Sequence, residues 1–224
     1  MFAALGFERP NRWLGLLLFA IVLDATVIAW LQVQAYNAFY TFSQDFGSFN
    51  QSFYTAAFQS QLFTYTSNLP AGTGGTYFAV HFSPFLFLIV PFYALFASPP
   101  TLLVFKAIAL ALGALPVYGL AHRRLGSPIW GFGLGLAYLL SPITMDLAWT
   151  TFDMEVFLPV LVLATIYFLT RRRYVPFLIF LLLSLSVIET IAPLLVLFLA
   201  VSLLGAFVGP KMLSASALLR ERVA

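Results

Sequence analysis

The chain has 224 residues, of which 62% are hydrophobic and only 8% are charged, and its mean hydropathy is +0.97. This composition lies far outside that of soluble proteins and indicates a polytopic membrane protein. The absence of cysteine excludes disulfides, thiolate catalysis and cysteine metal sites, and a net charge of +3 is too small to indicate nucleic-acid binding.

The apolar runs predict an all-α bundle of six transmembrane helices in a single membrane domain, residues 1–208, followed by a cytoplasmic tail, 209–224. The spans are expected at 13–33, 101–121, 129–145, 156–170 and, as two crossings, 174–208. The last run is too long for one crossing and must turn near residues 189–193. Asp24 interrupts the first span, where a charge is costly, so we expect it to be protonated or paired within the bundle. The third span is rich in glycine, which allows close helix packing: Gly131, Gly133 and Gly135.

The first outer loop, residues 34–100, contains a predicted interfacial helix at 43–62. Its apolar face is formed by residues that recur every three or four positions: Phe46, Phe49, Phe53, Ala57 and Phe58. Its other face is polar and uncharged: Ser48, Ser52, Thr55 and Gln59. Such a helix can lie flat at a membrane surface. Asp45 stands at its start, where a carboxylate suits the unpaired N–H groups and the positive end of the helix dipole.

Residues 81–97 decide the topology because they are apolar but short, with Pro84 suited to a first helical turn and Pro91 to a kink. If this segment crossed the membrane, only Arg9 and Arg12 would remain inside. If it does not cross, all basic residues outside the spans are cytoplasmic: Arg9, Arg12, Arg123, Arg124, Arg171, Arg172, Arg173, Lys211, Arg220 and Arg222. The positive-inside rule therefore favours an outer-leaflet helix at 81–97, a multi-pass protein of the cell membrane, and two cytoplasmic termini.

This topology gathers ionisable side chains at the outer membrane face: Asp45, His81, Asp146, Asp153, Glu155 and Glu189. Lys106 lies about one helical turn below them, from where its amine is expected to snorkel outward. Such groups are expensive to keep at a membrane unless they pair or bind a ligand. Carboxylates and a histidine can ligate a divalent cation, and one carboxylate can act as general base toward an acceptor hydroxyl. The metal or Lys106 would then hold a phosphate leaving group.

The most specific block of motifs in the chain is HFSPFLFLIVPFYALF, at 81–96. Weaker blocks are QDFGSFNQSFY at 44–54, ALPVYGLA at 114–121, FDMEVFLP at 152–159 and VIETIAP at 187–193. In this order, between Phe42 and Pro193, the blocks resemble those of a family of predicted multi-spanning membrane proteins of unknown function that is distantly similar to the GT-C glycosyltransferase superfamily. The resemblance implies a GT-C-like core, in which the first outer loop carries a catalytic aspartate and the second carries further acids.

GT-C enzymes move a sugar from a lipid-phosphate carrier to an acceptor at the outer membrane face, with inversion at the anomeric carbon. By resemblance, Asp45 is the catalytic carboxylate and Lys106 a ligand for the carrier phosphate. A divalent metal, Mg or Mn, would be held by three carboxylates: Asp45, Asp153 and Glu155. Substrate contacts are also expected at positions that match the family of unknown function, Gln51 and His81.

Structural explanations compete with these roles. Asp45 can be a plain helix cap, His81 can bond a loop carbonyl, and Asp153 and Glu155 can be solvated loop acids. Glu189 interrupts an apolar run where no loop is needed, so we expect it to point into a polar cavity.

The departures from the family pattern leave the function open. Asn50 stands where an acid is common, Asp153 where a histidine is expected, and Ile188 where a basic residue is expected. One interpretation is a transferase whose partner is a membrane lipid such as a polyprenyl-phosphate sugar. The alternative is a non-catalytic subunit or assembly factor of a membrane complex, with a protein partner, so whether the chain is an enzyme stays open. A transporter fits less well, because the acids lie at one face and not at midplane between inverted repeats.

Overall fold

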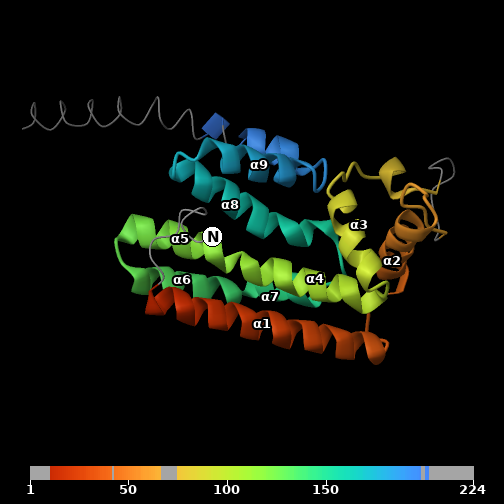
Figure 1. The fold of residues 1–224 in the computed structure, drawn as a ribbon, viewed down its shortest axis with the longest axis horizontal. Helices are drawn as coiled ribbons and strands as arrows, with labels where there is room; N and C mark the ends of the chain where they lie inside the picture. Colours follow the sequence, from red (N-terminus) through yellow and green to blue (C-terminus); the bar gives the residue numbers. More distant parts are fainter. Residues whose placement is uncertain (1–10, 42, 67–74, 198–199, 202–224) are drawn as a thin grey trace, which may run out of the picture. The chain divides into compact units, whose positions relative to one another are not determined.

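The computed structural model describes residues 11–41, 43–66, 75–197 and 200–201 (Figure 1). Over these residues the chain is all-α, as predicted, apart from an isolated bridge between Thr64 and Thr76. It divides into two compact units, Met1–Ile188 and Glu189–Ala224, which are treated separately. Several predicted cytoplasmic groups lie outside the described residues: Arg9, Lys211, Arg220, Arg222 and the tail 209–224.

The helices of the first unit follow the predicted order. They are α1 (Arg12–Asn37), α2 (Ser43–Phe58), α3 (Leu86–Leu95), α4 (Pro99–Leu112), α5 (Ala114–Leu125), α6 (Pro128–Leu139), α7 (Pro142–Trp149), α8 (Leu158–Thr170) and α9 (Tyr174–Leu185). Two short 3-10 turns are η1 (Tyr77–Ala79) and η2 (Met154–Phe157).

Two helices of the described chain are long and apolar enough to cross a membrane. They are α1, with 26 residues, and the continuous helix Pro99–Leu125, with 27 residues, formed by α4 and α5. A third candidate span is the pair α6 and α7, which is bent by 40° at a break just before Pro142. The remaining apolar helices are shorter. The structure thus supports two or three spans, and six crossings stay a prediction.

Glycines on α6 let this helix approach its neighbours closely. A Cβ atom at Gly131 would meet ring carbons of Tyr118 at 2.9 Å, and one at Gly135 would meet a methyl of Leu17 at 2.9 Å. Gly133 has open space instead. The prediction of close packing is therefore confirmed for two of the three glycines of this helix.

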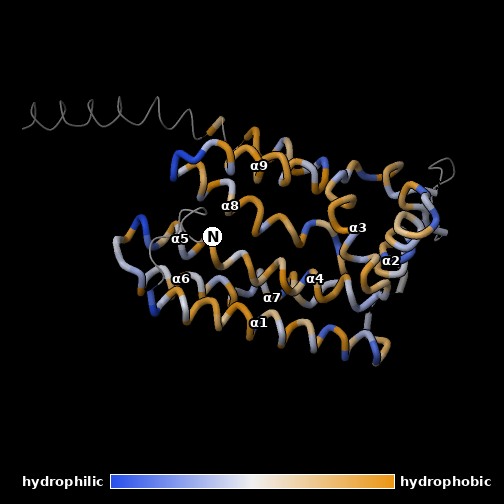
Figure 2. The backbone as a smooth tube through the Cα atoms, viewed as in Figure 1, coloured by the Kyte–Doolittle hydropathy of each residue, from blue (hydrophilic) through white to orange (hydrophobic). Residues whose placement is uncertain are grey.

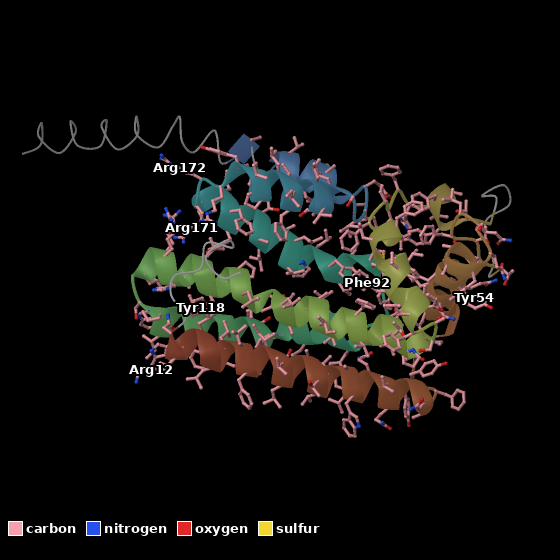
Figure 3. All side chains as sticks on the ribbon, viewed as in Figure 1. Arg12, Tyr54, Phe92, Tyr118, Arg171 and Arg172 are labelled. Carbon is pink, nitrogen blue, oxygen red and sulfur yellow. The ribbon has the colours of Figure 1, made fainter. Side chains whose placement is uncertain are left out.

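Positive charge gathers at one end of the first unit. The helix α1 begins at Arg12, α5 ends with Arg123 and Arg124, and α8 is followed by Arg171. Because successive long helices run in opposite directions, the start of α1 and the turns α5–α6 and α8–α9 lie at the same end (Figure 1). Figure 2 shows these turns as hydrophilic and the helices between the ends as mainly hydrophobic. In Figure 3, Arg12 and Arg171 lie at this end, whereas α2 and α3 lie at the other.

The helix α2 starts where the sequence predicts and ends four residues earlier, at Phe58. Phe46, Phe49 and Phe53 are buried, as expected for its aromatic face. The predicted polar face is correct only in part, because Gln59 is exposed and Ser48 partly buried, whereas Ser52 and Thr55 are buried. On the predicted apolar face, Phe58 is exposed and Ala57 is partly buried. The buried arc is therefore wider than the aromatic stripe, and α2 packs against α3 and α4 as part of the protein core.

The helix α3 has only 10 residues, so it is about 15 Å long, half the depth of a bilayer's hydrocarbon core. It begins at Leu86, two residues after Pro84, and Pro91 lies inside it. Its start is fixed by Phe85, whose N–H donates to the carbonyl of Ser186 at 2.9 Å, and by Ser83, whose hydroxyl donates to the carbonyl of Val187. The helix is shorter at both ends than the predicted 81–97, and its place in the outer leaflet stays a prediction.

The long apolar run after Tyr174 breaks, as predicted. The helix α9 ends at Leu185, residues 186–190 form turns, and helix resumes at 191. Glu189 therefore lies in the break, at the first residue of the second unit.

Candidate functional site

A cavity of about 330 Å³ lies between α2, η1 and η2. We call it the acidic cavity. Its lining combines three carboxylates, a histidine, two tyrosines, two hydroxyls and three apolar side chains: Asp45, Asp153, Glu155, His81, Tyr65, Tyr77, Ser48, Thr151, Phe49, Val80 and Ile188. Four of the site residues predicted from the sequence thus line this one cavity, although they come from three distant segments: Asp45, His81, Asp153 and Glu155.

The first wall is the start of α2. Asp45 lies in the first turn of this helix and its side chain is exposed, as expected for a carboxylate near a positive dipole end. One turn further, Phe49 packs its ring against Tyr77 at a centroid distance of 5.1 Å. This contact places α2 against η1, and the Tyr77 ring in turn lies 5.5 Å from that of His81.

The second wall is the turn between α7 and α8. Phe152 is buried and packs edge-on against Phe49, with ring centroids 5.3 Å apart. The residues that follow alternate in exposure. Met154 is buried, whereas Asp153 and Glu155 are exposed and line the cavity. The Asp153 carboxylate accepts a hydrogen bond from the Met154 N–H at 2.5 Å, which caps η2. Asp153 thus caps η2, a use that the sequence did not predict, and lines the cavity as well.

The third wall is the segment around Tyr65. The backbone pairs Tyr65 with Gly75 and Tyr77 with Phe63, each through an N–H to carbonyl hydrogen bond of 2.9 Å. Gly75 has a φ of 76°, which suits glycine at this turn. Partial burial raises the pKa of the Tyr65 phenol further above neutral pH. Tyr65 lines the cavity, and its phenol hydroxyl can donate a hydrogen bond.

Gln51, predicted to contact substrate, is not among the residues that line the acidic cavity. Its side-chain oxygen instead accepts hydrogen bonds from the N–H and the hydroxyl of Thr66, both at 3.0 Å. It therefore ties α2 to the segment that carries Tyr65, next to the cavity.

Lys106 is placed differently from the prediction. Its side chain is fully buried, and its Nζ donates to the carbonyls of Thr150 and of Thr151, the latter at 3.4 Å. The expectation that it snorkels outward is wrong, because these carbonyls satisfy the ammonium inside the protein. Lys106 thus does not line the cavity itself, but it donates a hydrogen bond to the backbone of Thr151, which does.

Three other predicted polar groups lie elsewhere. Asp146 is exposed on α7 and does not line the acidic cavity. Asp24 is partly buried on α1. Glu189, in the second unit, is exposed, and its carbonyl accepts a hydrogen bond from the Ala192 N–H at 3.3 Å. Its expected place in a polar cavity stays a prediction.

The predicted metal ligands share the cavity but are not arranged as a ligand set. Among the residues that the structure describes, no group of three or more histidine, aspartate or glutamate side chains is close enough to hold an ion. The residues as they stand do not fit a Mg or Mn centre made by Asp45, Asp153 and Glu155. The metal site therefore stays a prediction, and no step below depends on it.

The sequence did not single out Tyr65, Tyr77 or Thr151 as part of the site. No motif in the sequence marks Tyr77, because its contact with Phe49 depends on the fold. Thr151 could have been found, because it lies two residues before the predicted acid Asp153. Nothing in the sequence pattern marks Tyr65.

A family model supplies the comparison with known proteins. It is described as predicted membrane protein (DUF2079), and it matches residues 35–211, which is most of the chain. The chain belongs to this family. In this DUF2079 protein the matched range includes every residue of the acidic cavity. No curated protein and no solved structure matches the chain.

Proposed function

We propose that the protein binds the sugar of a lipid-phosphate carrier in the acidic cavity, at the outer membrane face, and transfers it to an acceptor hydroxyl. The observation that carries the proposal is the meeting of three carboxylates, a histidine and two tyrosines in one cavity of a membrane protein. This cavity lies at the end of the first unit that holds α2, away from Arg12 and Arg171 (Figure 3). By the positive-inside rule, that end faces outward and both termini are cytoplasmic.

The charge of the cavity decides which part of the carrier it takes. Its described lining contains three carboxylates and neither lysine nor arginine. A phosphate would be repelled there, whereas carboxylates accept hydrogen bonds from hydroxyl groups. The sugar therefore occupies the cavity, and the phosphate and its apolar chain stay outside it, at the level of the lipid headgroups.

Asp45 is the general base in this proposal. Within the described part of the chain its carboxylate makes neither a hydrogen bond nor an ion pair, so it is free to accept a proton. It takes the proton of the acceptor hydroxyl as that oxygen forms a bond to the anomeric carbon. The bond from this carbon to the phosphate oxygen breaks on the opposite side, the phosphate leaves with the electron pair, and the anomeric centre is inverted.

The test compares Asp45→Asn with Asp146→Asn, which removes an exposed acid of α7 outside the cavity. Purified wild type and both variants are incubated with polyprenyl-phosphate sugars of several kinds, and binding and sugar release are measured. We expect Asp45→Asn to keep binding but to lower turnover by about 10²–10⁴-fold, the usual contribution of a general base. Asp146→Asn should behave as wild type. Equal turnover of wild type and Asp45→Asn would exclude the proposed role.

A non-catalytic subunit is the second candidate, favoured by the burial of Lys106. This residue cannot reach a carrier phosphate while its ammonium bonds to Thr150 and Thr151, so one role implied by the GT-C resemblance is not met. A subunit predicts no binding of any sugar lipid by the isolated chain and co-purification of a defined membrane partner.

A further inference from the structure

Lys106 occupies an unusual place for a lysine. The helix α4 is otherwise apolar or weakly polar, and the Lys106 side chain is completely enclosed. A methionine would fill a similar volume without the cost of burying an ammonium group. Packing alone therefore does not explain why a lysine stands at this position. Its hydrogen bonds to two backbone carbonyls do explain it.

These partners lie where α7 ends. The last carbonyls of a helix have no partners within it, and a positive charge near them is favourable. At the end of α7, the carbonyl of Ala148 accepts a hydrogen bond from Gln32 Nε2 of α1 at 2.6 Å. Those of Thr150 and Thr151 accept from Lys106 of α4. Two buried side chains from two helices thus fix the backbone just before the second wall of the acidic cavity.

The chain then passes directly to the acids. Phe152 is fully buried against Phe49 and Phe53, with ring centroids 5.3 and 6.3 Å away, and Asp153 and Glu155 follow on the cavity side. The turn is therefore held at two adjacent points, by the ammonium at Thr150 and Thr151 and by the ring of Phe152.

We infer that Lys106 is a positioning residue, whose ammonium holds the carbonyls of Thr150 and Thr151 and so fixes the turn that presents Asp153 and Glu155 to the acidic cavity. It does this without touching the ligand. The inference rests on the proposed use of the cavity as a ligand site, but its structural part can be tested without any ligand.

The first experiment uses the absence of cysteine from the chain. Met154→Cys places a thiol on the fully buried side of η2, and Ala164→Cys places one in the buried face of α8. Each reporter is combined with Lys106→Met, which keeps the apolar stem, and with Lys106→Gln, which keeps a neutral donor. The rate of reaction with a water-soluble maleimide measures how often each site opens.

We expect Lys106→Met to raise labelling of Met154→Cys about tenfold, because a charged hydrogen bond to buried carbonyls is lost, and Lys106→Gln to raise it less. Labelling of Ala164→Cys should not change. The matched control is Gly131→Ala, which crowds α6 against Tyr118 away from the turn. If it raises labelling of Met154→Cys as much as Lys106→Met does, the effect is general loosening and the inference is overturned. An unchanged rate in Lys106→Met also overturns it.

The second experiment measures binding of a polyprenyl-phosphate sugar to the same variants. We expect Lys106→Met to weaken binding about tenfold and Lys106→Gln to weaken it less, in the order of their labelling rates. A loosened turn with unchanged affinity would overturn the positioning role. If wild type binds no sugar lipid, the proposed function fails, and the labelling result still decides whether Lys106 holds the turn.

Discussion

At the scale of single residues, α2 buries two hydroxyls, those of Ser52 and Thr55, which differ in their hydrogen bonds. Thr55 Oγ1 donates to the carbonyls of Ser52 and Thr64, at 3.0 and 2.9 Å, and accepts from the Thr64 N–H at 3.1 Å. Its hydroxyl therefore joins α2 to the chain that folds back after it. The Ser52 hydroxyl is also buried, but within the described residues it has no hydrogen-bond partner. The two positions differ in hydrogen bonding and hardly at all in exposure.

This difference gives opposite expectations for removing the two hydroxyls. Thr55→Val leaves the backbone groups of Thr64 without their partner, so it should lower the free energy of unfolding by about 1–3 kcal/mol. Ser52→Ala removes an unsatisfied polar atom and should be neutral or stabilising. Thermal unfolding in detergent measures both. A loss in Ser52→Ala as large as that in Thr55→Val would show that hydrogen bonding of the Thr55 hydroxyl is not the cause.

The same residues show how far periodicity predicts burial. The spacing of Phe46, Phe49 and Phe53 located the buried stripe of α2 correctly, because apolar residues repeat with the helix. It placed Ser52 and Thr55 on the exposed face, because a hydrogen bond to Thr64 across a loop leaves no trace in the pattern. Lys106 was misplaced for the same reason: its partners are backbone carbonyls, which every residue has.

At the scale of elements, the packing of α6 depends on which of its glycines face a neighbour. The sequence showed three glycines at alternating positions, and alternation on a helix puts them on different faces. Gly131 lies against Tyr118, whereas Gly133 faces open space. The sequence could predict that this helix makes a close contact through glycine. It could not predict which face of the helix makes that contact, because this depends on the position of α5.

The two glycines therefore predict stability changes of opposite sign. Gly131→Ala forces its new methyl group against the ring and the carbonyl of Tyr118, at 2.9 and 3.1 Å, and should cost about 1–3 kcal/mol. Gly133→Ala adds a methyl group where there is room and should stabilise the helix by up to about 1 kcal/mol. Unfolding midpoints of the two purified variants give the comparison. A destabilised Gly133→Ala would contradict the assigned faces.

At the scale of the whole molecule, charge at the two ends of the first unit was the most predictable feature. The arginines of 123–124 and 171–173 close apolar helices, and the acids Asp153 and Glu155 begin the helix that Arg171 follows. Helix direction alone then separates the acids from the arginines. The number of crossings was less predictable, because α6–α7, α8 and α9 are shorter or more bent than their apolar runs suggest. The helix pair α6–α7 is broken just before Pro142, α8 is preceded by η2, and α9 ends in the turns at 186–190. Hydropathy averages do not register such breaks.

The orientation can be tested with single cysteines in this cysteine-free chain. The helix α1 has 26 residues and is about 39 Å long, so it is long enough for its two ends to reach opposite faces of a hydrocarbon core of about 30 Å. Gln59→Cys lies just after α2, and Ser127→Cys lies in the turn between α5 and α6, which follows Arg123 and Arg124. We expect a membrane-impermeant maleimide to label Gln59→Cys in intact cells and Ser127→Cys only after permeabilisation, because arginine clusters stay in the cytoplasm. Labelling of Ser127→Cys in intact cells would place the arginines outside and the acidic cavity in the cytoplasm, where a lipid-linked sugar transferase of the proposed kind could not work.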